Sequence, residues 1–109
     1  MSQFKGKVAV VTGGARDIGK SISLALAKDL AEYGIRVNAV SPGTIDTDFH
    51  IGIKSTKPEV FKSWANNIML KRLGQPEDVA GVVSFLVSKD AGFLTAETIQ
   101  VGGGQALGI

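Results

Sequence analysis

The segment that most constrains the fold of this chain is a short apolar run that ends in glycines and leads straight into a helical pattern. The run covers residues 8–11 (Val-Ala-Val-Val), and residues 12–14 are Thr-Gly-Gly. A continuous apolar run of this length, closed by turn residues, is typical of a strand that is covered on both faces. The segment therefore predicts a strand of a buried, parallel sheet.

The helix that follows the glycines is predicted from apolar residues that recur at every fourth position. A stripe with this spacing lies on one face of an α-helix and is expected to be buried. Tyr33 and Gly34 close the helix, because glycine is the usual residue just past a helix end. The members of the stripe are Ile18, Ile22, Leu26 and Leu30.

The rest of the chain alternates further strands with helices. Residues 35–40 and 98–101 are predicted strands, residues 58–70 and the segment from Pro76 onward are predicted helices, and residues 44–57 are predicted to be a long loop. Strands that alternate with helices form parallel sheets with right-handed crossovers. We therefore expect a single α/β domain of the Rossmann type, reduced to about three strands that are parallel neighbours in one sheet.

Composition excludes several other classes of protein. The chain has no cysteine, so it has neither a disulfide framework nor a cysteine-ligated metal site, and we expect it in the reducing cytoplasm. Its 12 Lys and Arg and 10 Asp and Glu leave a net charge of +2 without a basic cluster, so nucleic acid is not an expected partner. No stretch approaches the roughly 20 apolar residues that a membrane span needs.

The glycine-rich turn between the first strand and the first helix has the features of a phosphate site. Unpaired N–H groups at a helix N-terminus carry about half a positive charge and attract anions. Gly13 would allow the tight turn, and Gly19 would let the helix pack close to the strand. The spacing departs from the usual dinucleotide pattern, G-x-G-x-x-G, and a plain strand–turn–helix junction is the alternative interpretation.

Three segments resemble the short-chain dehydrogenases/reductases, in the order in which that family carries them. Residues 7–19 are similar to its opening strand and its T-G-x-x-x-G-x-G motif. Residues 34–43 are similar to the strand and Pro-Gly turn after its catalytic helix, and residues 74–101 to its closing helix and strand. The resemblance, which points more narrowly to 3-oxoacyl-carrier-protein reductases and glucose dehydrogenases, implies NAD(P)-dependent hydride transfer between nicotinamide and a carbonyl or alcohol.

The chain also departs from the family pattern. Asp17 stands where the family motif has its middle glycine. The family's catalytic serine and Tyr-x-x-x-Lys pair have no counterpart, since Tyr33 is the only tyrosine and Val37 lies four positions after it. By the resemblance, a central part of the family sequence is missing, with a join near residues 25–31. No catalytic residue is therefore assigned.

The resemblance places the cofactor, NAD or NADP, on two segments. The first would surround the phosphates and adenosine, and the second would meet the nicotinamide amide. Arg16 favours NADP through a 2′-phosphate, with a solvated arginine as the alternative. Asp17 suits the helix dipole but would repel a pyrophosphate. The residues are Gly13, Arg16, Asp17, Ile18 and Gly19 in the first segment, and Pro42, Gly43, Ile45 and Thr47 in the second.

A metal site is not expected. Residues 46–50 (Asp-Thr-Asp-Phe-His) have a spacing that superficially resembles a set of ligands. A calcium loop that began at Asp46 would need glycine and glutamate where Ile51 and Lys57 stand. The apolar stripe that contains Phe61 and Trp64 is assigned to packing, with a cover over the substrate as the alternative.

Two functions from different classes remain open. The first is an oxidoreductase of the short-chain family that acts on a small carbonyl or alcohol substrate. The second is a catalytically inert module that binds nucleotide or pairs subunits, which the absent tyrosine–lysine pair favours for this chain. The resemblance also implies a homo-oligomer, a tetramer in the family, assembled through residues 74–101.

The join allows two structures for the first helix. If the chain is continuous there, residues 18–33 form one helix whose apolar stripe stays in phase across the join. If a stretch is missing, the halves belong to two different helices, and a break lies between Leu24 and Ala31. We favour the break, because the loss of central strands would remove most of the parent core.

Overall fold

The computed structural model of this chain describes residues 2–13 and 17–105. By its internal contacts the chain divides into two compact units. The first unit comprises residues 1–41 and 81–99, and the second comprises residues 42–80 and 100–109. Each unit is described by itself below.

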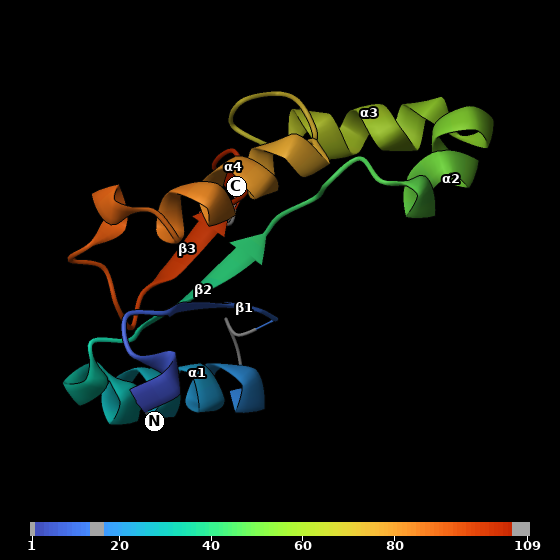
Figure 1. Ribbon diagram of the computed structural model, residues 1–109. Coiled ribbons are helices and arrows are strands. Elements are labelled where there is room, and N and C mark those ends of the chain that lie inside the picture. The colour runs from blue at the N-terminus through green and yellow to red at the C-terminus, as the bar shows by residue number, and fades with distance from the viewer. Residues whose placement is uncertain (1, 14–16, 106–109) are drawn as a thin grey trace. The chain divides into compact units, whose positions relative to one another are not determined.

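A parallel sheet forms the centre of the fold, as predicted (Figure 1). Its strands are β1 (Val8–Thr12), β2 (Arg36–Pro42) and β3 (Thr98–Val101), in the spatial order β1-β2-β3. β1 and β2 are parallel, with Val8 opposite Arg36 and Thr12 opposite Val40. The amide of Ala39 in β2 donates to the carbonyl of Glu97, 2.8 Å away, at the start of β3. The predicted α/β fold of the Rossmann type is confirmed.

The first helix runs without interruption through the predicted join. α1 (Asp17–Leu30) continues into a 3-10 turn (Ala31–Tyr33), and Gly34 closes it in the left-handed conformation, with φ of 70°. This is the outcome expected of a continuous chain. The predicted break between Leu24 and Ala31 is wrong, because the helix spans it and β1 pairs directly with β2. The join itself stays a prediction from the resemblance.

The buried face of α1 is not the one that the apolar stripe predicted. Ile18 and Ile22 are 76% and 54% exposed, whereas Ser23 and Ala27 are buried. Ala27 packs in one cluster with Ile35 and Val37, which β1 joins through Ala9 and Val11. Of the predicted stripe, Leu30 packs against this cluster, as expected. Small side chains on the line of Ser23 and Ala27 let α1 approach the sheet closely, and a sheet of this width leaves Ile18, Ile22 and Leu26 exposed.

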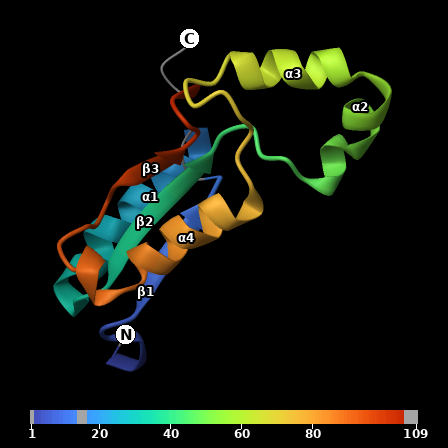
Figure 2. The same cartoon turned by 90° about the horizontal axis from the view of Figure 1, so that it is seen from above.

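The first unit has helical cover on both sides of its strands. α1 lies on one side, and residues 81–86 of α4 (Pro76–Leu86) lie on the other (Figure 2). Leu86 and Ala91 are buried, as are Ala39 and Val40 in β2. A 3-10 turn (Lys89–Ala91) follows α4, and another (Ser2–Phe4) precedes β1. The unit therefore has three layers, with β2 at their centre.

Polar side chains of β2 hold the loop that leads to β3. Arg36 donates to the carbonyls of Leu94 and Ser88, at 3.3 and 3.2 Å. Asn38, which is buried, donates to the Leu94 carbonyl at 3.1 Å and accepts a hydrogen bond from the amide of Glu97 at 3.2 Å. This buried amide thus satisfies two backbone groups that the sheet itself leaves without a partner.

The second unit contains more helix than was predicted. The predicted loop over residues 44–57 is wrong in its second half, which forms a 3-10 turn (Asp48–His50) and α2 (Ile51–Thr56). α3 (Pro58–Asn66) begins at its proline as expected but ends four residues before Leu70. Lys71 then adopts a positive φ of 61°, which turns the chain toward α4.

No helix in the described ranges, residues 2–13 and 17–105, is long and apolar enough to cross a membrane.

We predict that replacing Asn38 by alanine destabilises the first unit. The change removes the side-chain acceptor of the Glu97 amide and one of the two side-chain donors to the Leu94 carbonyl, which Arg36 still contacts. Loss of hydrogen bonds to a buried side chain of this kind costs about 1 kcal/mol or more. Urea denaturation followed by circular dichroism measures the loss. Asn66→Ala, at the exposed end of α3, is the matched control and should change the free energy of unfolding little. Equal effects of the two substitutions would contradict the assignment.

Candidate functional site

The predicted phosphate site lies between β1 and α1, and the structure describes both of its ends. β1 ends at Thr12, Gly13 follows with φ of 70°, and α1 begins at Asp17. A positive φ of this size is readily adopted by glycine and costs other residues energy. α1 thus starts four positions after Gly13, and the first amides of such a helix have no partner within the helix. Arg16 lies outside the described residues, so its predicted role stays a prediction.

The other predicted residues of this segment lie on the first turn of α1. Asp17 is the first residue of the helix. Ile18 is exposed, and Gly19 is partly buried. Exposure of Ile18 beside a helix N-terminus leaves it accessible to a ligand, whereas the packing role of Gly19 stays a prediction.

The second predicted segment begins where β2 ends, and it belongs to the second unit. The amide of Gly43 donates to the carbonyl of Val101 at 3.0 Å. A side chain at Gly43 would come within 2.9 Å of the Gly102 Cα and 2.8 Å of Gln105 Oε1. The backbone contact with Gly102 cannot yield as a flexible side chain could, so this position requires glycine.

Gln105 fixes the turn that follows Gly43. Its Oε1 accepts a hydrogen bond from the Thr44 amide, and its Nε2 donates to Thr44 Oγ1, both at 2.9 Å. One side chain thus binds the backbone and the hydroxyl of the same residue. The turn is held in a single conformation by a partner that lies 61 positions later in the sequence.

Ile45 and Thr47, the remaining predicted residues, extend the second segment. Ile45 forms an isolated parallel bridge with Gly74. A Cβ added to Gly74 would lie only 2.6 Å from the Cδ1 of Ile45. Thr47 is exposed, in extended backbone immediately before the 3-10 turn. The structure thus orders the second segment from Pro42 to Thr47 independently of the first, and the two belong to different units.

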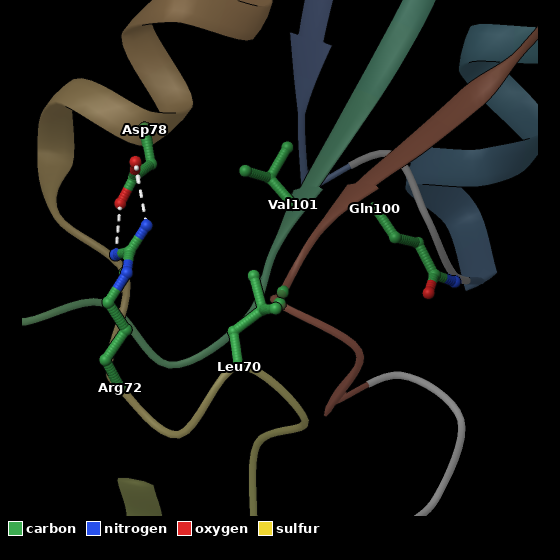
Figure 3. Close-up of a pocket in the computed structure, with 8 residues that line it drawn as sticks. Leu70, Arg72, Asp78, Gln100 and Val101 are labelled. Carbon is green, nitrogen blue, oxygen red and sulfur yellow. Dashed lines mark hydrogen bonds and ion pairs between the residues drawn. The ribbon is translucent and has the colours of Figure 1, made fainter.

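A cavity of about 300 Å³ in the second unit was not anticipated from the sequence (Figure 3). Leu70 and Val101 supply apolar side chains, and Arg72 and Asp78 face each other at one side while Gln100 extends away from them. The walls of the cavity come from two segments that lie 22 or more positions apart, and neither contains a recognisable motif. The sequence therefore gives no signal of this cavity. The lining residues are Leu70, Arg72, Gly74, Asp78, Gln100, Val101, Gly102 and Gly103.

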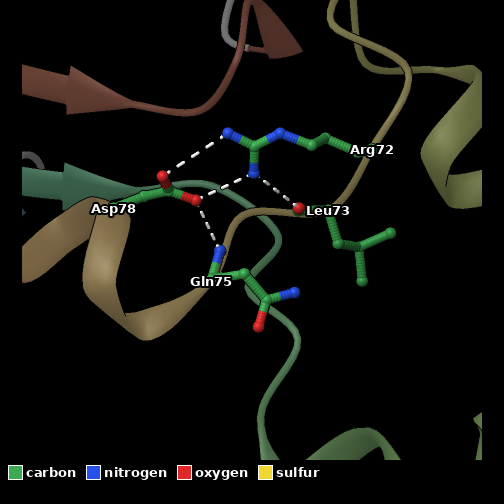
Figure 4. Close-up of polar contacts among 4 residues, drawn as sticks. All are labelled: Arg72, Leu73, Gln75 and Asp78. Carbon is green, nitrogen blue, oxygen red and sulfur yellow. Dashed lines mark hydrogen bonds and ion pairs between the residues drawn. The ribbon is translucent and has the colours of Figure 1, made fainter.

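An ion pair closes one side of this cavity and begins α4 (Figure 4). Arg72 Nη1 lies 2.9 Å from Asp78 Oδ2, and that same oxygen accepts a hydrogen bond from the Gln75 amide at 2.7 Å. A carboxylate on the third helical residue that binds the amide before the helix is one half of a capping box. The hydrogen bond from Arg72 holds the pKa of Asp78 below its usual range, and the guanidinium pKa of Arg72 is raised in return.

A second ion pair lies in the segment that superficially resembled a metal site. Lys54 Nζ donates to Asp46 Oδ2 at 3.0 Å, and this bond lowers the pKa of the Asp46 carboxyl. Lys54 also lies over the ring of Phe61, 5.3 Å from its centre. Asp46 therefore has a lysine as its neighbour, and within the described part of the chain no three His, Cys, Asp or Glu side chains gather around a metal position.

Aromatic side chains connect α3 with the segment before it. The rings of His50 and Trp64 meet edge to face with centres 5.3 Å apart, and Phe61 lies 6.2 Å from Trp64. Both α3 aromatics are half-buried within the second unit. These contacts support the assignment of this stripe to packing.

Comparisons with known proteins agree with the fold and with the motifs. A family model described as Enoyl-(Acyl carrier protein) reductase matches residues 6–106. The Dehydrogenase/reductase SDR family member 4 of Homo sapiens is 48% identical over 79 residues, which cover 72% of this chain and 28% of that protein. The Nodulation protein G of Azospirillum brasilense is 39% identical over 80 residues, covering 73% and 31%. The chain thus spans about a third of the length of these relatives.

Solved structures resemble this chain over most of its length. A short-chain type dehydrogenase/reductase from Mycobacterium ulcerans is 30% identical with a TM-score of 0.78, covering 98% of this chain and 44% of that one. A short chain dehydrogenase family protein from Francisella tularensis is 28% identical with a TM-score of 0.78, covering 94% and 52%. The similarity extends across both units, while each of these proteins has about as many residues again that this chain does not match.

We predict that the Arg72–Asp78 pair makes stability fall in acid. A carboxyl whose pKa is lowered by folding stabilises the folded state above its unfolded pKa, near 3.8, and that contribution disappears as the pH falls through the lowered value. Thermal unfolding between about pH 2 and pH 7 should show this fall for the parent and a shallower one for Asp78→Asn. Glu77→Gln, in the same helical turn, is the control. A parallel pH profile for Asp78→Asn and the parent would argue against the pair.

Proposed function

The chain belongs to the short-chain dehydrogenase/reductase family, and from that membership we propose that it binds NAD or NADP at the turn between β1 and α1. The family consists of NAD(P)-dependent oxidoreductases. The observation that carries the proposal is the sequence of strand, left-handed Gly13 and helix, in which α1 begins with Asp17 four residues after that glycine. Amides at the start of such a helix bind phosphate oxygens, and the helix dipole favours their charge.

The residues present fit a dinucleotide on two grounds. Among the described residues, no atom lies within 4 Å of the position that a Cβ would occupy on Gly13. Gly19 adds no side chain on the first turns of the helix, and the exposed Ile18 offers an apolar contact for an adenosine ring. The bound group supplies hydride exchange at its nicotinamide, and the chain's own residues here bind and orient.

Asp17 opposes binding without abolishing the site. A unit charge about 7 Å from a phosphate, at an effective dielectric constant of about 20, costs about 2 kcal/mol. The helix dipole offsets part of that cost for either anion. We infer weak binding of the dinucleotide, with the choice between NAD and NADP depending on Arg16.

The family resemblance assigns the nicotinamide amide to the second segment, which hydrogen bonds and a close contact hold in place within the second unit. Gln105 and the close contact at Gly43 hold the turn after β2, which in the family meets the nicotinamide amide. Pro42, Ile45 and Thr47 are the residues that the family motif would place there. Thr47 presents an exposed hydroxyl suited to a hydrogen bond with an amide.

For this chain by itself we propose binding without turnover. The family transfers hydride to or from a carbonyl or alcohol with a tyrosine as the proton donor, a lysine that lowers its pKa and a serine that holds the substrate oxygen. The single tyrosine, Tyr33, closes α1 and has Val37 four positions after it, inside the buried strand β2. A homo-oligomer assembled through residues 74–101 and a cytoplasmic location remain part of the proposal, and the small carbonyl or alcohol substrate belongs to the family reaction.

We predict that dinucleotide binding depends on Gly19. A valine there would push α1 away from β1 and displace the amides of the helix N-terminus, so the dissociation constant for NADH or NADPH should rise about tenfold or more. Calorimetric titration measures the constant for each dinucleotide. Gly81→Val in α4 is the matched control, because a Cβ at Gly81 meets no atom within 4 Å. Equal affinities of parent and Gly19→Val would remove this site.

We also predict no carbonyl reductase turnover by this chain with either NADH or NADPH. Loss of a positioned proton donor lowers a rate by about 10²–10⁴. Absorbance of the reduced nicotinamide, followed with a panel of small ketones and aldehydes, gives the rate. Protein whose intact mass is verified as 11.4 kDa must be used. Turnover above the uncatalysed rate would contradict the proposal and would require another proton donor in this chain.

A further inference from the structure

The edge of the sheet at β1 carries none of the features that protect an exposed strand. In the described part of the chain β1 pairs with β2 alone, so one row of its backbone N–H and C=O groups faces outward. Its sequence, Val-Ala-Val-Val-Thr, contains no charge and no proline. Exposed edges in soluble proteins usually carry a charge, a proline, a bulge or a cover, because an open edge accepts a strand from another chain.

The exposed apolar stripe of α1 lies on the same side as this open edge. α1 buries the line of Ser23 and Ala27 against the strands. The crossover from β1 through α1 to β2 is parallel, and such crossovers are right-handed. In this geometry, the residues one position before Ser23 and Ala27 point to the β1 side of the helix and away from β2. The line of these residues contains Ile18, Ile22 and Leu26, all of them exposed. The edge strand and the apolar stripe thus form one continuous surface within the first unit, here named the β1 edge surface.

We propose that the β1 edge surface pairs with the same surface of a second copy of this chain. In the pair, β1 lies antiparallel to its counterpart about a two-fold axis perpendicular to the sheet, which gives a six-stranded sheet. With this axis, each face of one sheet continues into the same face of the other. The two α1 helices therefore lie antiparallel on one face, with their apolar stripes in contact. A two-fold interface of this kind is self-complementary, as closed symmetric dimers require.

A second copy fits this surface better than an unrelated partner for two reasons. It supplies at once the two groups that the surface lacks, a strand without charges and an apolar helix face. It also complements the charge of α1, because Asp29 lies in line with Ile18 and Ile22 near the C-terminal end of the helix. In the antiparallel pair this carboxylate approaches the N-terminus of the other α1, where the helix dipole is positive. The pair and a dinucleotide bound at that N-terminus therefore compete.

This surface differs from the one that the family resemblance assigns to oligomer contacts, residues 74–101. The opposite edge strand, β3, is shorter than β1 and has the exposed polar residue Gln100. Only residues 98 and 99 of β3 belong to the first unit. The β1 edge therefore has the longer and more apolar strand, with an uncovered helix stripe beside it.

The size of the surface determines how strong the pair is. It is about 20 Å long, the length of α1, and roughly 15 Å wide, one strand spacing plus one helix diameter. A stable interface buries about 800 Å² on each partner, which is more than a strip of this size provides. We therefore expect a dimer that forms at high protein concentration and dissociates on dilution.

Sedimentation equilibrium of the 109-residue chain from about 1 μM to about 1 mM tests the proposal, a range chosen around weak association. The mass should rise from 11.4 kDa toward twice that value. Leu26→Gln, in the apolar stripe, should raise the dissociation constant about tenfold or more. Leu24→Gln is the matched control. Leu24 and Leu26 both lie on α1 and are 42% and 40% exposed, but they face different sides of the helix.

Hydrogen exchange separates the strand contact from the helix contact. Amides of β1 that do not face β2 should become protected only at concentrations where the dimer forms, in the parent and in Leu24→Gln. If Leu26→Gln loses its helical circular dichroism, Ile22→Gln replaces it. A monomer over the whole concentration range overturns the proposal, and so does a dimer that Leu24→Gln weakens as much as Leu26→Gln. A dimer without concentration-dependent protection of β1 overturns the strand pairing.

Discussion

The hydrogen-bonded ladder of β2 is the interaction on which the rest of the first unit depends. Its backbone pairs with β1 on one side, and the Ala39 amide binds the Glu97 carbonyl on the other. Val37 and Val40 are buried with it, so the strand gains from apolar burial and from its main chain at once. β2 also positions Asn38 and Arg36, which bind the loop over residues 88–97. The seven residues of the strand therefore hold this loop in place as well.

The second unit depends instead on close contacts at glycines, where another residue approaches the glycine backbone. An atom of a residue far away in the sequence lies within 3.0 Å of the position that a Cβ would occupy at four described glycines: Gly43 (Gly102), Gly74 (Ile45), Gly103 (Ile68) and Gly104 (Met69). Each contact joins segments far apart in the sequence, and each is shorter than 3.0 Å for the added carbon. Such contacts fix the turn after β2 without a large apolar core, which explains why Ile68 and Leu73 are the buried apolar side chains of this unit among the described residues.

The strands could be predicted from the sequence because continuous apolar runs closed by glycine or proline have few other interpretations. The start of α4 was equally readable, since Pro76 and the acids after it are typical of a first helical turn. The Arg72–Asp78 pair was not, because its geometry depends on the positive φ of Lys71 and on a capping contact at Gln75. Gly13 and Gly19 were identified as a turn and a packing position, but periodicity contains no information about what a ligand would meet there.

The wrong prediction for α1 has a physical cause that extends beyond this helix. Periodicity tells which residues share a face, but the number of strands decides how much of that face is covered. α1 has apolar residues over a wider arc than a sheet of β1, β2 and β3 can cover, so its contact with the sheet is set by the small side chains of Ser23 and Ala27. The bulkier residues on either side then remain in water. The apolar face of α1 suits a wider sheet, and the edge strand β1 beside it carries no charge. Burial of this apolar surface is therefore incomplete within a single copy, and further strands beside β1 would complete it.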